Sequence, residues 1–347
     1  FPVEEGVIFQ GNTGISDPLG HHNLQLNGSF HTVSQDYGYG LSYLNRSTRV
    51  DLSGFFSERQ QFLPGSGITF TNQFAGASAC FVPSYFHNWR SRFGWSYANT
   101  QGLFKRNGPS VGLFYADSHS EAGSFWNGNQ SLSLGMISYL PGDSLVSYNK
   151  YTLGIQRSFA EIGTRRHSLF FSLKGSHAPL IQTNNQLLTL GDTTIAGNFL
   201  ATLVNSQYLM RGYASASFIG RSLVNLNSEY RFPVWDIYQG PGLFPVFFRN
   251  LTAAFFVDGV TVDGVFLRSD LTAYQRSRLG TTFWSTGLDF NLNLTTAYRL
   301  PININLGLYY GLNRETVGGF QPFISLGYGT LESVDQTQND KWAFGAF

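Results

Sequence analysis

The residues that most readily carry out chemistry are few, and their spacing predicts no catalytic site. Gly108-Pro109-Ser110-Val111-Gly112 has the G-x-S-x-G form of a serine nucleophile elbow. That elbow requires a strand before the serine and a helix after it, but here a strand-like segment follows. The seven histidines show no metal-ligand spacing, and the single cysteine, Cys80, can form neither an internal disulfide nor a multi-cysteine metal site. We therefore expect no enzymatic activity, no metal and no other cofactor.

The composition indicates which elements the chain is built from. Only 12% of its 347 residues are charged and 16% are aromatic, whereas an average globular chain has about 25% charged residues. This combination argues against disorder and against an ordinary helical enzyme. The net charge of +1 provides no global field that would attract nucleic acid. No uncharged apolar run reaches the length of about 18 residues that a transmembrane helix needs.

The main sequence signal is a strict alternation of apolar and polar residues. One stretch places Trp284, Leu288, Phe290, Leu292 and Leu294 on one face, and Ser285, Gly287, Asp289, Asn291 and Asn293 on the other. Residues 302–311 and 321–329 repeat this pattern. Because successive side chains of a strand point to opposite faces, these stretches predict strands with one apolar and one polar face.

A soluble β-sandwich would give the same alternation, but three features favour a transmembrane barrel. The polar faces carry Asn, Ser, Thr, Gln and Gly rather than Lys and Glu. The stretches are about 9–11 residues long, which suits a tilted strand that crosses a bilayer. Aromatic residues gather at their ends, as in an interfacial girdle.

We accordingly predict an all-β transmembrane antiparallel up-and-down β-barrel of 14 to 16 strands, whose first and last strands pair with each other. Its expected strands are 23–32, 38–45, 48–57, 68–82, 90–99, 110–117, 130–140, 146–159, 167–177, 222–233, 250–259, 284–299, 301–312 and 320–330. Further strands are expected at 6–15 and within 185–204. Residues 178–221 form a long connection of the functional kind, and residues 234–249 indicate a turn at the membrane surface.

Three motifs occur in a fixed order around and after the long connection. They are Leu209-Met210-Arg211-Gly212-Tyr213, then Asn227-Ser228-Glu229-Tyr230-Arg231-Phe232-Pro233, then Phe255-Phe256-Val257-Asp258-Gly259. This trio resembles the bacterial surface antigen superfamily of outer-membrane insertase and translocase barrels, which includes BamA and the two-partner-secretion transporters. The resemblance covers about residues 16–330, with Met210 standing where the family prefers Val or Ile.

The resemblance implies that the Met210-Arg211-Gly212-Tyr213 loop folds back into the lumen and that its arginine meets acids of the inner wall. The alternation independently places Glu229, Arg231 and Asp258 on polar faces. We therefore predict a cluster of Arg211, Glu229 and Asp258, with Arg231 and Gly259 as further wall partners of the loop. Without the resemblance, the alternative is an Arg211 in a solvated outer loop.

The expected organisation has residues 1–21 as a periplasmic segment or first strand, 22–330 as the barrel, with 178–221 inserted in its lumen, and 331–347 as a tail. The resemblance implies a bacterial outer-membrane location and a barrel that helps proteins to insert or translocate through the seam between first and last strands. The expected partners are outer-membrane lipids and other periplasmic or outer-membrane proteins, and no nucleic acid. A passive polar pore and a membrane anchor for partner proteins are the alternative functions.

Overall fold

The computed structural model describes most of the chain, and every regular element in the described part is a β-strand. The described residues are 8–31, 37–63, 68–81, 88–100, 104–119, 128–140, 147–160, 162–163, 166–178, 210–213, 218–241, 245–267, 274–277, 281–296, 300–313 and 318–328. Within these ranges, no helix has the length and apolar character needed to cross a bilayer.

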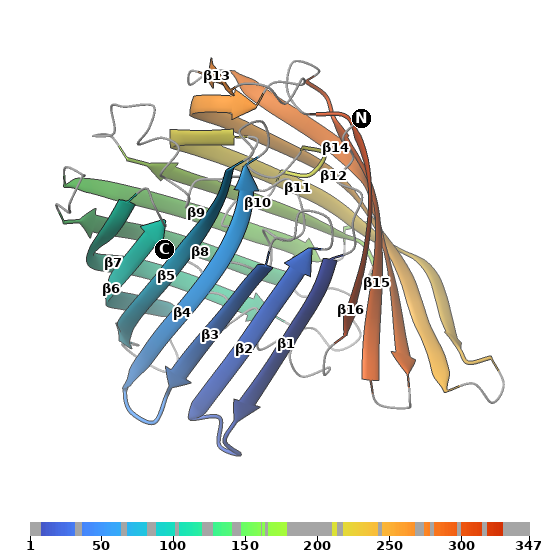
Figure 1. Ribbon diagram of the computed structural model, residues 1–347. Coiled ribbons are helices and arrows are strands. Elements are labelled where there is room, and N and C mark those ends of the chain that lie inside the picture. Colours follow the sequence, from blue (N-terminus) through green and yellow to red (C-terminus); the bar gives the residue numbers. More distant parts are fainter. Residues whose placement is uncertain are drawn as a thin grey trace.

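The strands form a single antiparallel sheet that curls into a barrel (Figure 1). Fifteen strands are hydrogen-bonded in chain order from β1 to β16, and the short β13 pairs with β12 beside this path. The bounds are β1 (Ile8–Ser16), β2 (His22–His31), β3 (Tyr37–Asn45), β4 (Val50–Leu63), β5 (Ile68–Phe81), β6 (Trp89–Thr100), β7 (Phe104–His119), β8 (Gly128–Tyr139), β9 (Tyr148–Ala160), β10 (Ser168–His177), β11 (Phe218–Gln239), β12 (Val246–Leu267), β13 (Tyr274–Ser277), β14 (Thr282–Thr296), β15 (Leu300–Gly311) and β16 (Phe320–Tyr328). The predicted all-β barrel is confirmed.

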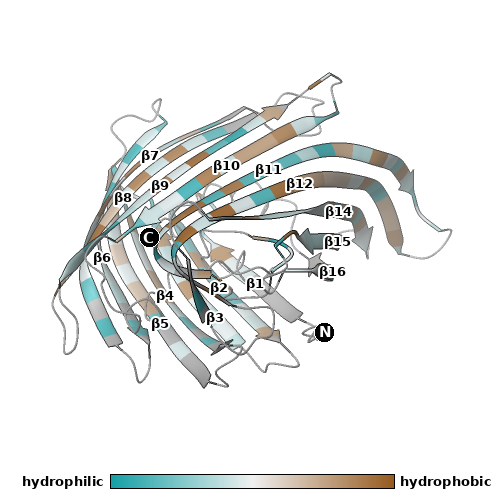
Figure 2. Ribbon diagram, turned by 90° about the horizontal axis from the view of Figure 1, so that it is seen from above, coloured by the Kyte–Doolittle hydropathy of each residue, from teal (hydrophilic) through white to brown (hydrophobic). Residues whose placement is uncertain are grey.

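The two faces of the wall differ in polarity in the way the alternation predicts. On β15, Leu306 and Leu308 are each 46% exposed, whereas Tyr309, which follows Leu308, points inward and is 6% exposed. Along much of β11, hydrophilic and hydrophobic residues alternate (Figure 2). The outer face is therefore apolar over the strand centres, which suits contact with lipid acyl chains.

The strand list is largely confirmed, with differences at a few places. The strand expected at 6–15 is present as β1, but one expected within 185–204 falls outside the described residues. β13 has only four residues, too few for an alternation to be recognised. The long connection ends earlier than predicted, because β11 already begins at Phe218.

The expected turn over residues 234–249 is wrong in extent, because most of these residues continue β11 and begin β12. Each of these strands has 22 residues. The β11–β12 register shifts between Pro233 and Trp235 and again between Asp236 and Gln239. A bulge lets a strand continue past a proline that a regular ladder would exclude, so Pro233 does not end β11, which runs to Gln239 just before Gly240 and Pro241.

The two ends of the sheet, β1 and β16, have a directional relation that the sequence did not predict. Because fifteen strands on the path alternate in direction, the first and the last run the same way. Each has nine residues, and no ladder between them occurs among the described residues. The expected pairing of the first with the last strand would therefore be parallel, unlike the other pairs along the path.

Candidate functional site

The tip of the long connection, residues 210–213, lies against the start of β14, the end of β15 and the residues just before β16. Gly212 has a φ of +79°, which favours glycine. A Cβ atom on Gly212 would lie 2.8 Å from the backbone nitrogen of Gly311 at the end of β15. Tyr213 forms an isolated antiparallel bridge with Gly318, and its hydroxyl donates to the carbonyl oxygen of Trp284 at 2.8 Å. The tip is thus fixed by backbone contacts that only a residue without a side chain permits at position 212.

Arg211 projects from this tip to carboxylates on three different strands. Its Nε and Nη2 atoms donate to the two oxygens of Asp258 on β12, at 2.8 Å each. Its Nη1 atom lies 2.8 Å from Glu229 Oε1 on β11 and 2.8 Å from Asp289 Oδ2 on β14. The Arg211–Asp258 pair has the bidentate geometry that makes arginine–carboxylate interactions strong and directional. The structure therefore brings together Arg211, Glu229 and Asp258, which we call the loop-tip cluster.

The loop-tip cluster is largely removed from solvent. The side chains of Asp258, Arg211 and Glu229 are 0%, 7% and 12% exposed. Burial of the guanidinium disfavours its charge, but the carboxylates of Asp258 and Glu229 outweigh burial and raise the pKa of Arg211 above its ordinary value. Because buried charges are stable only when paired and hydrogen-bonded, the buried charge of each cluster member is stabilised by the charges of the others.

Neighbouring side chains that sequence reasoning did not single out complete the surroundings of Arg211. The guanidinium carbon lies 3.5 Å from the centroid of the Phe256 ring, a cation–π contact. Asn227 donates to Asp258 Oδ1 at 2.9 Å, and Tyr309 forms a side-chain hydrogen bond with Asp289. Asp289 was placed on a polar face, but the alternation carries no information on which strand of the wall the loop tip meets.

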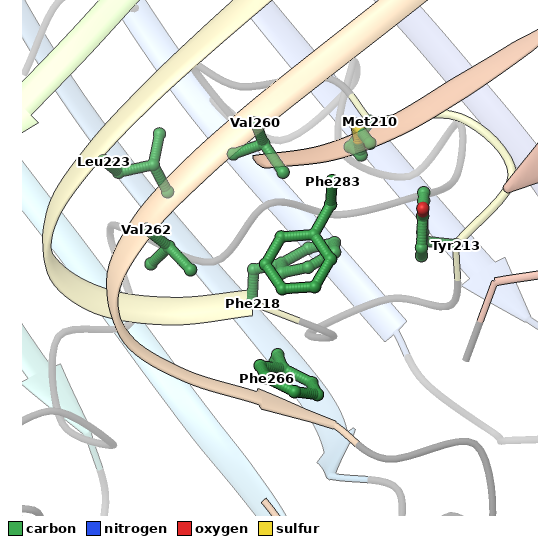
Figure 3. Close-up of a cluster of buried hydrophobic side chains, with 8 residues drawn as sticks. All are labelled: Met210, Tyr213, Phe218, Leu223, Val260, Val262, Phe266 and Phe283. Carbon is green, nitrogen blue, oxygen red and sulfur yellow. The ribbon is translucent and has the colours of Figure 1, made fainter. Parts of the chain in front are cut away.

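Met210 anchors the same loop in an apolar cluster on the inner wall. It is fully buried against side chains of β11, β12 and β14 (Figure 3). The members of this cluster are Met210, Tyr213, Phe218, Leu223, Val260, Val262, Phe266 and Phe283. The inner face beyond Asp258 is thus apolar rather than polar, since the loop covers it.

The two remaining expected wall partners have different surroundings. Arg231 contacts Glu229 through Nη2 at 2.6 Å and through Nε at 2.9 Å, so it supports an acid of the loop-tip cluster without a described contact to the loop. Gly259 faces away from the loop, because a Cβ atom on it would lie 2.6 Å from the ring of Trp284. Gly259 therefore makes room for an aromatic ring on the neighbouring strand.

The described part of the chain shows the surroundings of the serine in the G-x-S-x-G motif. Ser110 lies inside β7 and pairs with Ile137 of β8, so the strand–turn–helix geometry of a nucleophile elbow is not formed there. No group of three or more His, Cys, Asp or Glu side chains within the described ranges could hold a metal ion. What the loop-tip cluster can do is hold one end of the long connection rigidly inside the barrel.

Comparisons with known proteins identify the fold. No family model and no curated protein matches the sequence. Among solved structures, BamA from Haemophilus ducreyi lacking POTRA domains 1–3 is similar with a TM-score of 0.57 at 14% identity, over 93% of this chain and 70% of that one. CdiB from Escherichia coli has a TM-score of 0.56 at 13% identity, over 92% of this chain and 58% of that one. CdiB from Acinetobacter baumannii has a TM-score of 0.57 at 14% identity, over 94% of this chain and 57% of that one.

These likenesses show that the chain has the barrel fold of BamA and CdiB, as the motif resemblance implied. The chain spans a little under three fifths of the CdiB structures that it matches.

Proposed function

We propose that the protein is a bacterial outer-membrane barrel of the insertase or translocase type, which acts on other polypeptides without a chemical reaction. The observation that carries this proposal is the relation between the two end strands of the sheet. β1 and β16 run in the same direction, so they cannot join by the antiparallel pairing that the rest of the wall uses. Each presents a row of backbone donors and acceptors that can pair with another strand.

An extended client segment fits this seam by simple geometry. A strand antiparallel to β1 is also antiparallel to β16, so one added segment could pair with both in the pattern that the rest of the wall uses. β16 also contains Pro322, and proline within sheets is confined largely to edge strands and bulges. The seam is therefore suited to strand exchange, in which backbone hydrogen bonds supply affinity and alternate side-chain positions supply selectivity.

The loop-tip cluster supports this function as a positioning device. It joins the long connection to β11 and β12, Arg211 also contacts Asp289 on β14, and Tyr213 joins the same loop to Gly318 just before β16. A rigid support on this side of the barrel would hold β16 in place while the opposite edge, β1, admits a client. The proposed roles of Met210, Arg211, Gly212 and Tyr213 are thus structural, with Glu229 and Asp258 as their wall partners.

A cysteine-capture experiment tests the seam directly. In a Cys80→Ser background, single cysteines are introduced at Thr13 in β1, at Ile324 in β16 and, as a matched control, at Leu134 in the fully paired β8. All three positions are described and exposed on the barrel wall. The client is an unfolded eight-stranded outer-membrane barrel with one cysteine in its last strand, presented to the protein in lipid vesicles.

Mixed disulfides are expected at Thr13→Cys and Ile324→Cys and not at Leu134→Cys. Equal capture at all three positions, or client insertion at the same rate with and without the protein, would contradict the proposal. Steady ion conductance in planar bilayers without client capture would favour the passive pore instead.

A further inference from the structure

The outer wall carries a groove that the proposed function does not use. It has a volume of about 810 Å³ and crosses the neighbouring strands β7 to β11 (Figure 1). The side chains that border it face outward; Leu113, Leu134 and Leu153, for example, are 41%, 43% and 39% exposed. We call this depression the wall groove. Because it lies on the apolar outer face of the barrel, the medium that fills it is the membrane.

A row of apolar residues forms one border of the wall groove, and a glycine interrupts this row. The strand register sets its members opposite one another from β7 to β11, in the order Leu113, Leu134, Leu153, Gly175 and Val224. Gly175 has no side chain, so the row has a gap between Leu153 and Val224. The atoms nearest to a Cβ on Gly175 would lie at 3.5 Å and 3.9 Å, which is ordinary van der Waals contact. The gap is therefore open space beside the β10 backbone.

The row on the other border changes from apolar to polar along its length. Val111 and Met136 come first, on β7 and β8, and Tyr151, His177 and Ser222 follow on β9, β10 and β11. Nδ1 of His177 lies 2.6 Å from Oγ of Ser222, so Nε2, on the opposite side of the ring, is directed away from Ser222. The side chains of His177 and Tyr151 are both exposed on the outer face. An imidazole and a phenol thus lie next to each other at one end of the wall groove.

The polar and apolar ends of the wall groove lie at different depths of the wall. His177 is the last residue of β10 and Tyr151 lies near the start of β9, at the end of the barrel where the long connection begins. Val111 and Leu113 lie at the centre of the 16-residue β7. The wall groove therefore runs from the rim of the barrel to the middle of the wall. It crosses four inter-strand spacings, roughly 19 Å, which suits an inclined path through one leaflet of about 15 Å.

We propose that the wall groove binds a phospholipid of the surrounding bilayer, with one acyl chain along the apolar row and the phosphate against Tyr151 and His177. Ser222 donates to Nδ1 of His177, and Nε2–H of His177 and the Tyr151 hydroxyl donate to the phosphate oxygens. The polar groups lie at the rim, where a phosphate lies, and the leucines lie at the depth of the acyl chains. This inference goes beyond the proposed function, because strand exchange between β1 and β16 does not involve β7 to β11.

Photolabelling of the full chain in phosphatidylcholine vesicles tests this site. The vesicles contain a trace of phosphatidylcholine that carries a diazirine at the end of one acyl chain, and the labelled residues are identified by mass spectrometry of peptides after illumination. Labelling of Leu113 and Leu134 is compared with labelling of Leu306 on β15, which is 46% exposed and thus equally accessible to passing lipid. We expect the label to be concentrated at Leu113 and Leu134. A diacylglycerol with the same chains but no phosphate should lose this preference.

Variants test the acyl-chain and phosphate contacts separately. Gly175→Leu fills the gap in the apolar row and should abolish the preference. Gly54→Leu is the matched control, because Gly54 faces outward on β4 like Leu52 and also has room for a side chain. Tyr151→Phe combined with His177→Ala should lower the labelling ratio about tenfold, since both hydrogen bonds to the charged phosphate are lost. Heat-dependent mobility on gels verifies that each variant barrel is folded.

Labelling of the three leucines in proportion to their exposure would overturn the proposal, because the wall groove would then hold only passing lipid. Equal preference from the phosphatidylcholine and diacylglycerol probes would overturn it too, since no phosphate would be recognised. So would a preference that persists unchanged in Gly175→Leu and in the variant that lacks the Tyr151 hydroxyl and the His177 imidazole.

Discussion

Replacement of Arg211 by alanine tests the loop-tip cluster most severely. The guanidinium makes two hydrogen bonds to Asp258, whose side chain is 0% exposed, and contacts Glu229 and Asp289 through Nη1. In Arg211→Ala, Glu229 keeps Arg231 as a partner and Asp289 is 25% exposed, so water can solvate it. Most of the loss in unfolding free energy therefore comes from the buried carboxylate of Asp258. Leaving one buried carboxylate without its partner costs about 3–5 kcal/mol.

The assay is equilibrium unfolding in guanidinium chloride, with the protein in lipid vesicles and tryptophan fluorescence as the signal. Arg211→Ala should lose about 3–5 kcal/mol of unfolding free energy, together with protection of residues 179–209 from proteinase K. Arg231→Ala is the matched control, because its side chain is 30% exposed and Glu229 keeps Arg211 as a partner, so its loss of unfolding free energy should be clearly smaller than that of Arg211→Ala. Adding Asp258→Asn to Arg211→Ala should restore part of the loss, with a coupling energy of about 1–3 kcal/mol.

The reasoning would be refuted by an Arg211→Ala protein that unfolds at the parental denaturant concentration and keeps its loop protected. Strictly additive losses from Arg211→Ala and Asp258→Asn would refute it equally, because additivity means that the two residues do not act on each other.

Three further predictions follow from the loop tip and the wall. Gly212→Ala should cost about 1–3 kcal/mol, because alanine is strained at positive φ and its Cβ would crowd the backbone of Gly311; faster proteolysis of the long connection is the readout, and unchanged protection would count against it. Tyr213→Phe should cost about 0.5–1.5 kcal/mol, since it removes a hydrogen bond to the carbonyl of Trp284, which still accepts from the backbone of Leu312; a denaturant midpoint within error of the parent would contradict this. Leu306→Lys, on the exposed outer face of β15, should cost about 2–4 kcal/mol in vesicles, whereas Asn305→Lys on the inner face should cost much less. Equal losses for these two lysines would mean that the faces are misassigned.

Much of the wall could be predicted from sequence because its signal is local. The faces of β11, β14 and β15 follow from alternation alone, and Glu229 and Asp258 were placed inward by the same rule. The ordered motifs around Arg211 then indicated which loop meets those acids. The local pattern was therefore enough to predict which face of the wall a residue lies on, because that depends on one strand at a time.

The features that the sequence did not predict depend on contacts between strands, or on bulges that let a strand continue past a residue that usually ends it. Asp289 reaches Arg211 only because β14 pairs with β12 in a register that sets Asp289 opposite Ala254, and sequence periodicity cannot give that register. The sequence predicts that a strand ends at Pro233, but register shifts let β11 continue to Gln239. The same direction of β1 and β16 follows from the number of paired strands, a global property that no single segment encodes.

The central claim is that alternate residues of one wall face lipid and lumen, and spin labels on β15 measure this most directly. Single cysteines at residues 302 to 306 in a Cys80→Ser background are spin-labelled, and collision with oxygen, which partitions into lipid, is compared with collision with a water-soluble nickel complex. The account predicts that oxygen collisions dominate at Ile302, Ile304 and Leu306 and that nickel accessibility is relatively higher at Asn303 and Asn305. Accessibility that rises or falls smoothly along β15, with no period of two, would contradict it.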